Sequence, residues 1–369
     1  MLPYLFSDLG GAFRLLDSFT FRAGAALMTA LLICFIIGQP LINWLKSKQG
    51  AGQPIRDDGP ETHLLKQGTP TMGGAMILIG IFAATLLWAD LGNPLLWIAL
   101  FVIGCYGLIG FADDWLKVTS QSTGGLSGRI RLFLEAVVAI EAAILFVQFS
   151  GAEPQFLNVL YIPFFEYDTA SDPSWNPIYI GFIAFSLLAV IVMVGSSNAV
   201  NMTDGLDGLA IVPVMITAGS FALIAYLVGT PNYSQELALP QIDRARELAL
   251  ICATMVGAGL GFLWFNAPPA KVFMGDTGSL SIGAGLGIIA VMTRHEIVLG
   301  IIGGLFVMEA LSVIIQVGSF KMTGRRVFRM APIHHHFEKM GWPESTVVIR
   351  FWIISVILAL IGLSSLKLQ

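Results

Sequence analysis

The sequence predicts an all-α, polytopic integral membrane protein of about ten transmembrane helices, with both termini on the non-cytoplasmic side. Of its 369 residues, 56% are hydrophobic and only 12% are charged, and the mean hydropathy is +0.78. A typical soluble domain has roughly 45–50% apolar and about 25% charged residues. Since a transmembrane helix needs about 20 apolar residues, the chain is long enough for about ten spans and their loops.

Apolar runs separated by polar or Gly- and Pro-rich breaks predict where these spans lie, and the eighth run is notably short. The runs lie at about 22–45, 72–90, 94–112, 132–150, 178–195, 208–229, 247–265, 279–293, 297–319 and 347–366. No internal repeat is evident, which disfavours a transporter built from inverted halves. We expect one transmembrane domain over residues 1–369.

The distribution of Lys and Arg predicts the orientation of the spans, because basic residues favour cytoplasmic loops. The loops after the first, third, seventh and ninth spans hold thirteen basic residues, whereas the opposite side holds six. The connection over 151–177 has four acidic residues and no basic one, as an external loop can. An even number of spans then places both termini outside the cytoplasm.

Composition also excludes several functional classes. A net charge of -4 provides no basic surface for nucleic acid, so we expect no nucleic-acid partner. The three cysteines lie singly in apolar runs and predict neither a disulfide framework nor a metal cluster. Two GAGLG segments, at 257–261 and 283–287, lie inside apolar spans with no strand before them, which favours close helix packing over dinucleotide binding.

Polar side chains gather in four segments that the predicted orientation places on the cytoplasmic side. Ionisable groups in or next to spans are costly and tend to be functional. The segments contain, in chain order, Asp113 and Asp114; Asn198, Asn201, Asp204 and Asp207; Asn266, Lys271 and Asp276; and His334, His335 and His336.

Each segment also has a plainer structural explanation. Asp113 and Asp114 fit a solvated helix end, and Asp276 fits an N-cap before an apolar helix. Asp204 and Asp207 fit an ordinary Gly-rich turn with helix-capping aspartates. The basic residues before the histidines fit a membrane surface. However, three loops on one face combine Asp with Gly and Asn, which favours a magnesium-assisted phosphate site, because oxygen ligands suit this ion. In such a site histidines are better suited to bind phosphate or sugar oxygens than metal.

Six motifs together resemble the phospho-N-acetylmuramoyl-pentapeptide transferases. They are TPTMGG (69–74), FADDWLK (111–117), GLSGRIRL (125–132), SSNAVNMTDGLDGLA (196–210), FNAPPAKVFMGDTGSL (265–280) and APIHHHFE (331–338). The similarity covers essentially the whole chain. Single motifs are shared with the wider polyprenyl-phosphate N-acetylhexosamine-1-phosphate transferase superfamily, whereas the first and last resemble the muramoyl-pentapeptide branch.

The resemblance implies transfer of phospho-MurNAc-pentapeptide from UDP-MurNAc-pentapeptide to undecaprenyl phosphate, giving lipid I and UMP, the first membrane step of peptidoglycan synthesis. It further implies dependence on Mg²⁺ and a place in the lipid bilayer of the bacterial cytoplasmic (inner) membrane, with the active site facing the cytoplasm. The oligomeric state stays open, with a homodimer as one alternative. The active-site loops would be those at about 46–71, 113–131, 196–207, 266–278 and 320–346.

The resemblance also implies roles for individual residues. Asp276 would be a catalytic residue and the magnesium ligand, while Asp113 and Asp114 would attend the acceptor phosphate, one of them as a base. Phe273 would offer a stacking face for uracil. Arg131 stands where many relatives are expected to have Lys, and the two cations differ in geometry. The full substrate-binding set would be Lys66, Thr71, Arg131, Asn198, Asn201, Asp204, Gly205, Leu206, Asp207, Asn266, Phe273, Gln316, His334, His335 and His336.

Two other functions remain alternatives. A polyprenyl-phosphate GlcNAc-1-phosphate transferase would share the aspartates and differ in the loop that reads the sugar. A membrane transporter fits the ten spans and Glu309 in the ninth, although transporters gather polar groups near the midplane. We expect Glu309 to point into the bundle near Gly303 and Gly304, where a helix bends most easily.

Overall fold

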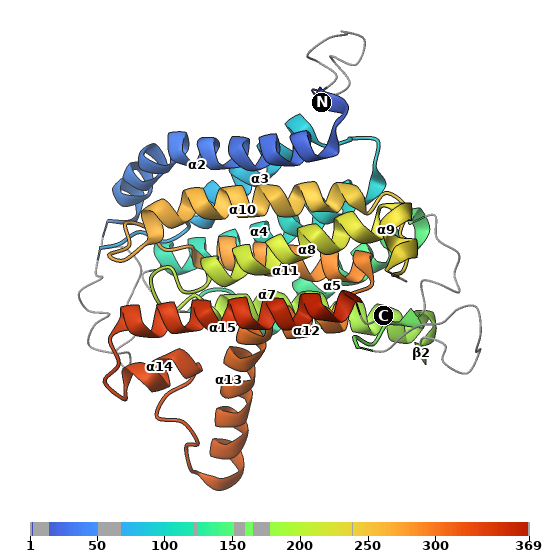
Figure 1. Cartoon of the computed structure of the whole chain (residues 1–369). Helices are drawn as coiled ribbons and strands as arrows, with labels where there is room; N and C mark the ends of the chain where they lie inside the picture. The colour runs from blue at the N-terminus through green and yellow to red at the C-terminus, as the bar shows by residue number, and fades with distance from the viewer. Residues whose placement is uncertain are drawn as a thin grey trace.

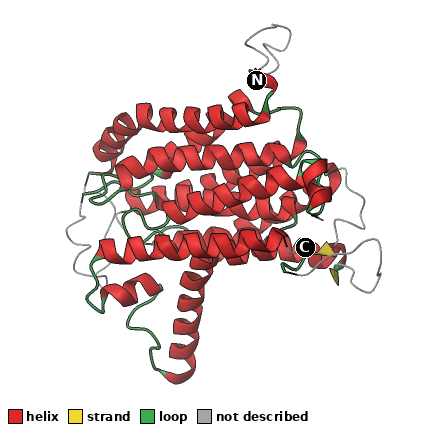
Figure 2. Ribbon diagram, in the orientation of Figure 1, coloured by secondary structure: helices red, strands yellow, loops and turns green. Residues whose placement is uncertain are grey.

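The computed structural model describes Leu2 and residues 15–50, 68–120, 124–150, 159–164, 178–237 and 239–367. Regular structure within these ranges is almost entirely helical (Figure 2). Lys66 lies outside the described residues, as does most of the first expected active-site loop. The main helices are α2 (Phe19–Gln49), α3 (Gly74–Trp88), α4 (Pro94–Thr119), α5 (Gly128–Phe149), α7 (Gly181–Thr203), α8 (Ile211–Val228), α10 (Arg246–Asn266), α11 (Gly275–Thr293), α13 (Gly304–Thr323) and α15 (Glu344–Ser364).

The helices confirm the predicted all-α, polytopic membrane class. Eight of the described helices are long and apolar enough to cross a membrane, namely α2, α4, α7, α8, α10, α11, α13 and α15. The remaining predicted spans, 72–90 and 132–150, form α3 and α5. The eighth span is longer than expected, with 19 residues, because helix α11 begins at Gly275 rather than near 279.

The ninth predicted span is divided into two helices at Gly303. The helix α12 (Glu296–Ile302) ends there and α13 begins at Gly304. In Figure 1, α13 runs away from the bundle, whereas α12 lies beside α15. The bend that the sequence predicts near these two glycines is therefore confirmed.

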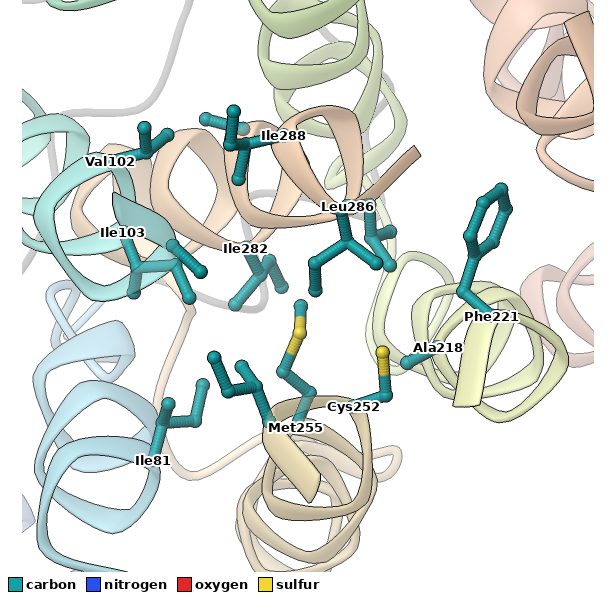
Figure 3. Close-up of a cluster of buried hydrophobic side chains, with 14 of the residues drawn as sticks. Ile81, Val102, Ile103, Ala218, Phe221, Cys252, Met255, Ile282, Leu286 and Ile288 are labelled. Atoms are coloured by element: carbon teal, nitrogen blue, oxygen red, sulfur yellow. The ribbon is translucent and has the colours of Figure 1, made fainter. Parts of the chain in front are cut away.

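Helix α11 forms the centre of the bundle. Along its span 94% of the residues are buried, and it packs against α3, α4, α7, α8 and α12. Figure 3 shows Met255 of α10 pointing between Ile282 and Leu286 of α11, with Ile103 of α4 on the side of Ile282. Phe221 of α8 belongs to the same buried cluster. A helix surrounded by protein is held by packing on all sides, so its first turn is a rigid platform for a site.

Small residues allow the helices around this centre to approach closely, which confirms the packing interpretation of the two GAGLG segments. A Cβ at Gly283 of α11 would lie 2.7 Å from the Ser196 carbonyl oxygen of α7. At Gly257 of α10 a Cβ would collide with the backbone of Leu27 on α2. Glycine is needed at both places because a side chain would push neighbouring backbones apart.

The two ends of the bundle carry different structures. At one end lie α14 (Ile333–Glu338) and the start of α15, and at the other lie α9 (Pro231–Glu236), the C-terminus and an antiparallel pair of short strands (Figure 1). The strands are β1 (Val159–Leu160) and β2 (Ile178–Tyr179), with Val159 opposite Tyr179. The expected polar segments belong to the end with α14.

Candidate active site

The carboxylate of Asp276, in the first turn of α11, lies at the centre of the candidate site. Its Oδ2 atom is 3.0 Å from Lys117 Nζ and 3.2 Å from Arg131 Nη1. Its Oδ1 atom accepts a hydrogen bond of 2.6 Å from Asn201 Nδ2. Three helices, α4, α5 and α7, thus each direct one donor at the same carboxylate.

Asp114 caps the N-terminus of α11. Its Oδ1 accepts from the Asp276 N–H at 3.1 Å, and its Oδ2 accepts from the Thr277 N–H at 2.9 Å and the Thr277 hydroxyl at 2.7 Å. These bonds satisfy free N–H groups of the first turn. They also explain why α11 begins earlier than hydropathy predicts. Gly275, with φ of 72°, packs so tightly that a Cβ would lie 2.6 Å from Asp114 Oδ2.

Asp113 forms an ion pair with Lys117 and does not cap α11. Lys117, one turn further along α4, places Nζ 2.5 Å from Asp113 Oδ2 and so joins the Asp113 and Asp276 carboxylates. The other oxygen, Oδ1, accepts from the Leu126 N–H at 2.7 Å, which ties the segment before α5 to α4. Asp113 and Asp114 are neighbours in sequence, but among the described residues only Asp113 of the two forms an ion pair with a cation that also contacts Asp276.

Asn198 and Asn201 lie one turn apart on α7 and differ in what they contact. Asn201 bonds Asp276 and Ser279 Oγ directly. Asn198 accepts from Arg131 Nη2 at 3.0 Å and donates to Glu135 Oε2 at 2.6 Å. Asn198 is therefore a bridge between α5 and α7, and it reaches Asp276 only through Arg131.

The turn from Asp204 to Gly208 links the Asp276 cluster to the histidines. The Gly275 N–H donates to the Asp204 carboxylate. Burial, together with the charges of Asp276, Asp114 and Asp207, raises the pKa of Asp204 to about 7. One residue further, Gly205 lies against the His334 ring, where a Cβ would collide with Nε2.

Several of the expected binding residues hold loops together. Asn266 accepts from the Gly208 N–H and donates to the Val272 carbonyl, each at 2.9 Å. Asp207 accepts from the Ala270 N–H at 3.0 Å. Leu206 is buried in the cluster formed with α15. These contacts fix the loop between α10 and α11 against the turn after α7.

The TPTMGG motif (69–74) packs beside the loop between α10 and α11. The Phe273 N–H donates to the Pro70 carbonyl at 2.9 Å, and the Gly73 N–H returns a bond to the Phe273 carbonyl at 2.8 Å. Thr71 is 1% exposed and its backbone bonds Gln49 at the end of α2. The Phe273 side chain is half-buried, so part of its surface stays accessible.

The three histidines of α14 have three different environments. His334 is buried, with Nδ1 3.1 Å from Glu309 Oε1, and His336 Nδ1 accepts from the Arg329 N–H at 3.1 Å. His335 Nδ1 lies 2.6 Å from Glu338 Oε2. Burial lowers the pKa of His335 below its usual range, although the Glu338 carboxylate acts in the opposite direction.

Glu309 is fully buried, which confirms that it points into the protein rather than towards lipid. Gln316, two turns further along α13, accepts from the Val327 and Phe328 N–H groups and donates to the Phe328 carbonyl. Its amide therefore orders the chain before α14. The contacts described for Gln316 do not include the Asp276 cluster.

The structure adds two site residues that the sequence-based set lacks, Lys117 and Glu135. Lys117 had a detectable signal, because it follows Asp113 at the i+4 spacing that forms ion pairs on a helix. Glu135 has the same spacing from Arg131, but its position inside an apolar span conceals its contact with Asn198 on another helix.

The excess of carboxylates around Asp276 suits a magnesium ion, although these side chains do not form a complete ligand set. Among the described residues no three His, Cys, Asp or Glu side chains are arranged to hold a metal. Magnesium usually takes one or two carboxylates and completes its shell with water and substrate phosphates. Carboxylates outnumber cations here, with Asp113, Asp114, Asp204, Asp276 and Glu135 around Lys117 and Arg131.

Comparison with known proteins gives concordant results. The model of "Glycosyl transferase family 4" matches residues 96–294, and "Phospho-N-acetylmuramoyl-pentapeptide-transferase signature 1" matches residues 66–78. A protein of Maricaulis maris (strain MCS10), named phospho-N-acetylmuramoyl-pentapeptide-transferase, is 55% identical over 376 residues, and the similarity covers 100% of both chains.

Proposed function

The chain belongs to the phospho-N-acetylmuramoyl-pentapeptide-transferase family, and we infer that it transfers phospho-MurNAc-pentapeptide from UDP-MurNAc-pentapeptide to undecaprenyl phosphate, giving lipid I and UMP. The observation that carries this inference is the place of the Asp276 cluster, at the end of apolar helices and among cations. A lipid phosphate and a soluble nucleotide can meet there, and phosphoryl transfer depends mostly on such positioning.

We propose a direct displacement. An oxygen of the acceptor phosphate bonds to the phosphorus next to the sugar, while the bond from that phosphorus to the bridging oxygen breaks and UMP leaves. Lys117 and Arg131 are placed to neutralise phosphate oxygens, and Asp113 holds Lys117. Because Asp114 is occupied as the α11 cap, Asp113 is the better candidate to attend the acceptor.

We propose that Asp276 binds Mg²⁺ together with substrate phosphates. Bound there, the ion would neutralise charge on the diphosphate. Lys117, Arg131 and Asn201 surround the same carboxylate and would position it. Thr71, Phe273 and the 204–208 turn would border the nucleotide, and the α14 histidines would border the sugar and peptide. Phe273 would stack on uracil through its accessible face.

The site would face the cytoplasm of the bacterial inner membrane. Basic residues lie in and beside the site, including Lys117, Arg131, Lys271 and Arg329, and basic loops favour the cytoplasm. UDP-linked substrates are cytoplasmic molecules, so the proposed orientation and reaction agree.

The test is UMP release by purified protein given UDP-MurNAc-pentapeptide, undecaprenyl phosphate and magnesium. We expect release that needs both substrates and stops on chelation of magnesium. Faster release from UDP-GlcNAc would favour the GlcNAc-1-phosphate transferase instead. No release from either, with vesicle uptake of a solute, would favour a transporter. A phospho-MurNAc adduct trapped on an aspartate would overturn direct displacement.

A further inference from the structure

We propose that Glu135 is a positioning residue, which holds Arg131 and Asn198 in the orientation from which Arg131 reaches Asp276. The proposal rests on the transfer reaction inferred above. Among the described contacts, Glu135 has no hydrogen bond or ion pair with Asp113 or Asp276, and it acts through Arg131 and Asn198.

The position of Glu135 is unusual for a carboxylate, since its side chain is 0% exposed inside an apolar helix. A buried charge is expensive unless it is paired and hydrogen-bonded. Its Oε2 atom accepts the 2.6 Å bond from Asn198 Nδ2, and its Oε1 atom lies 3.6 Å from Arg131 Nε. The carboxylate therefore faces two groups of the site at once.

Arg131 is held at both ends of its guanidinium. Nε faces Glu135, one helical turn further along α5, while Nη1 contacts Asp276 and Nη2 contacts Asn198 Oδ1. Among the described atoms, Arg131 Nε and Glu135 Oε1 have no hydrogen-bond partner, and both are buried. Each therefore faces the other across a gap slightly longer than a hydrogen bond.

Asn198 completes a closed set of contacts. Its Nδ2 atom donates to Glu135 and to the Val194 carbonyl, and its Oδ1 atom accepts from Arg131. The ionised Glu135 carboxylate and the Val194 carbonyl can only accept, so both bind the NH₂ group of the Asn198 amide and leave its oxygen facing Arg131. If the amide turned around, its NH₂ group would meet the guanidinium and repel it.

The backbone of Glu135 is anchored independently of its charge. The Tyr106 hydroxyl of α4 donates to the Glu135 carbonyl at 2.8 Å. This bond is made by the backbone and not by the carboxylate, so we expect a substitution of the side chain to alter the orientation of Arg131 and to leave the junction of α4 and α5 in place.

The experiment is a double-mutant cycle on UMP release, with Glu135→Gln and Arg131→Ala made singly and together. We expect Glu135→Gln to lower kcat by about tenfold to about a hundredfold, as a misplacement of about 1 Å does. In the Arg131→Ala background we expect the same change to alter kcat by no more than about twofold, since its target is gone. Thermal unfolding of Glu135→Gln should stay close to that of the unmodified protein.

The matched control is Glu141→Gln, on the same helix but exposed, which should keep full activity. Equal losses from Glu135→Gln in both backgrounds, or no loss in the unmodified background, would overturn the proposal. If Glu135→Gln does not fold, Glu135→Asp takes its place in the double-mutant cycle, because Asp keeps the charge and its shorter side chain widens the gap to Arg131. If the unmodified protein and Glu141→Gln release no UMP, the proposed function has failed instead.

Discussion

Among single residues, Asp276 and Asp114 have different partners: the Asp276 carboxylate contacts side chains of three helices, whereas Asp114 accepts from the first turn of α11. Donors from α4, α5 and α7 meet the Asp276 carboxylate, while the backbone of its turn donates to Asp114 and, through the Gly275 N–H, to Asp204. The charge at the centre of the site and the fold of the surrounding turn thus depend on different carboxylates.

Replacement of Asp276 by Asn should therefore abolish UMP release without unfolding the protein. The change removes the charge that faces Lys117 and Arg131, but the Asp114 cap remains. Turnover and thermal unfolding measured together check this, with the exposed Asp243→Asn as the control. Near-normal activity at ordinary magnesium would show that Asp276 is not the metal ligand.

Asp204 should make stability depend on pH. Burial and nearby carboxylates raise its pKa in the folded protein to about 7, above the usual 3.8. The folded state therefore retains a proton that the unfolded state loses, so this group's contribution to stability falls as pH rises from about 4 to about 7. The Asp204→Asn variant has no carboxyl group to titrate at this position, so its stability lacks this dependence on pH.

The unfolding temperature of Asp204→Asn, minus that of the unmodified protein, should thus rise between pH 4 and pH 7 and level off above about pH 7. Unfolding in detergent at a series of pH values measures this difference. A difference that is constant across the series would mean that Asp204 keeps its ordinary pKa.

Phe273 and Asp113 should separate binding from turnover. Stacking of a base on an aromatic ring is worth about 1–3 kcal/mol, which is roughly one to two decades of affinity. Phe273→Ala should weaken UMP binding by that factor, whereas Asp113→Asn should lower kcat with little effect on UMP binding. Calorimetry beside steady-state kinetics checks both, and equal losses of affinity would contradict the division.

Among the helices, a buried ion pair at the opposite end of the bundle joins α2 to α10. Arg22 Nη2 lies 2.6 Å from Glu247 Oε1, and Arg22 Nη1 donates to the Trp88 carbonyl. Glu247 Oε2 also accepts from the Asp90 N–H at the end of α3. The pair thus holds α2, α10 and the end of α3 together.

Arg22→Met should destabilise the fold by about 3–5 kcal/mol, because it leaves Glu247 buried without its cation. Adding Glu247→Leu should recover most of that loss, since no unpaired charge is then left. Unfolding in detergent measures both, with exposed Lys48→Met on α2 as the control. If the double variant is as unstable as Arg22→Met, the pair itself provides the stability.

In the whole molecule, the polar site occupies one end of the bundle and the strands occupy the other (Figure 1). This arrangement suits an enzyme that meets a soluble substrate on one face of the membrane, and it does not suit a transporter with its polar groups at the midplane. The proposed orientation, with the site facing the cytoplasm, rests on the excess of basic residues in the loops at the site end.

Cysteine labelling of whole cells tests this orientation. After removal of Cys34, Cys105 and Cys252, a cysteine at exposed Gln241 should react with a membrane-impermeant maleimide in intact cells. A cysteine at exposed Lys339 should react only after the membrane is opened. The reverse pattern would place the site outside the cytoplasm.

Hydropathy and motifs in the sequence were sufficient for the class and the family, and each predicted apolar run contains a helix, the ninth run being divided into α12 and α13. Long apolar runs have few alternatives in a bilayer, where backbone groups must bond within their own helix. The bend near Gly303 and the burial of Glu309 were also predictable, because each follows from a local rule about glycine or about charge in lipid.

Which polar and charged groups meet across different helices was decided only by tertiary structure. Asp113 and Asp114 are adjacent in sequence, yet one joins a cation and the other caps α11, since successive residues of a helix point in different directions. Likewise Glu135 meets Asn198 only because α5 packs against α7. Hydropathy determines that a helix is buried, but its rotation and depth against its neighbours depend on packing between helices, and these select the side chains that meet at Asp276.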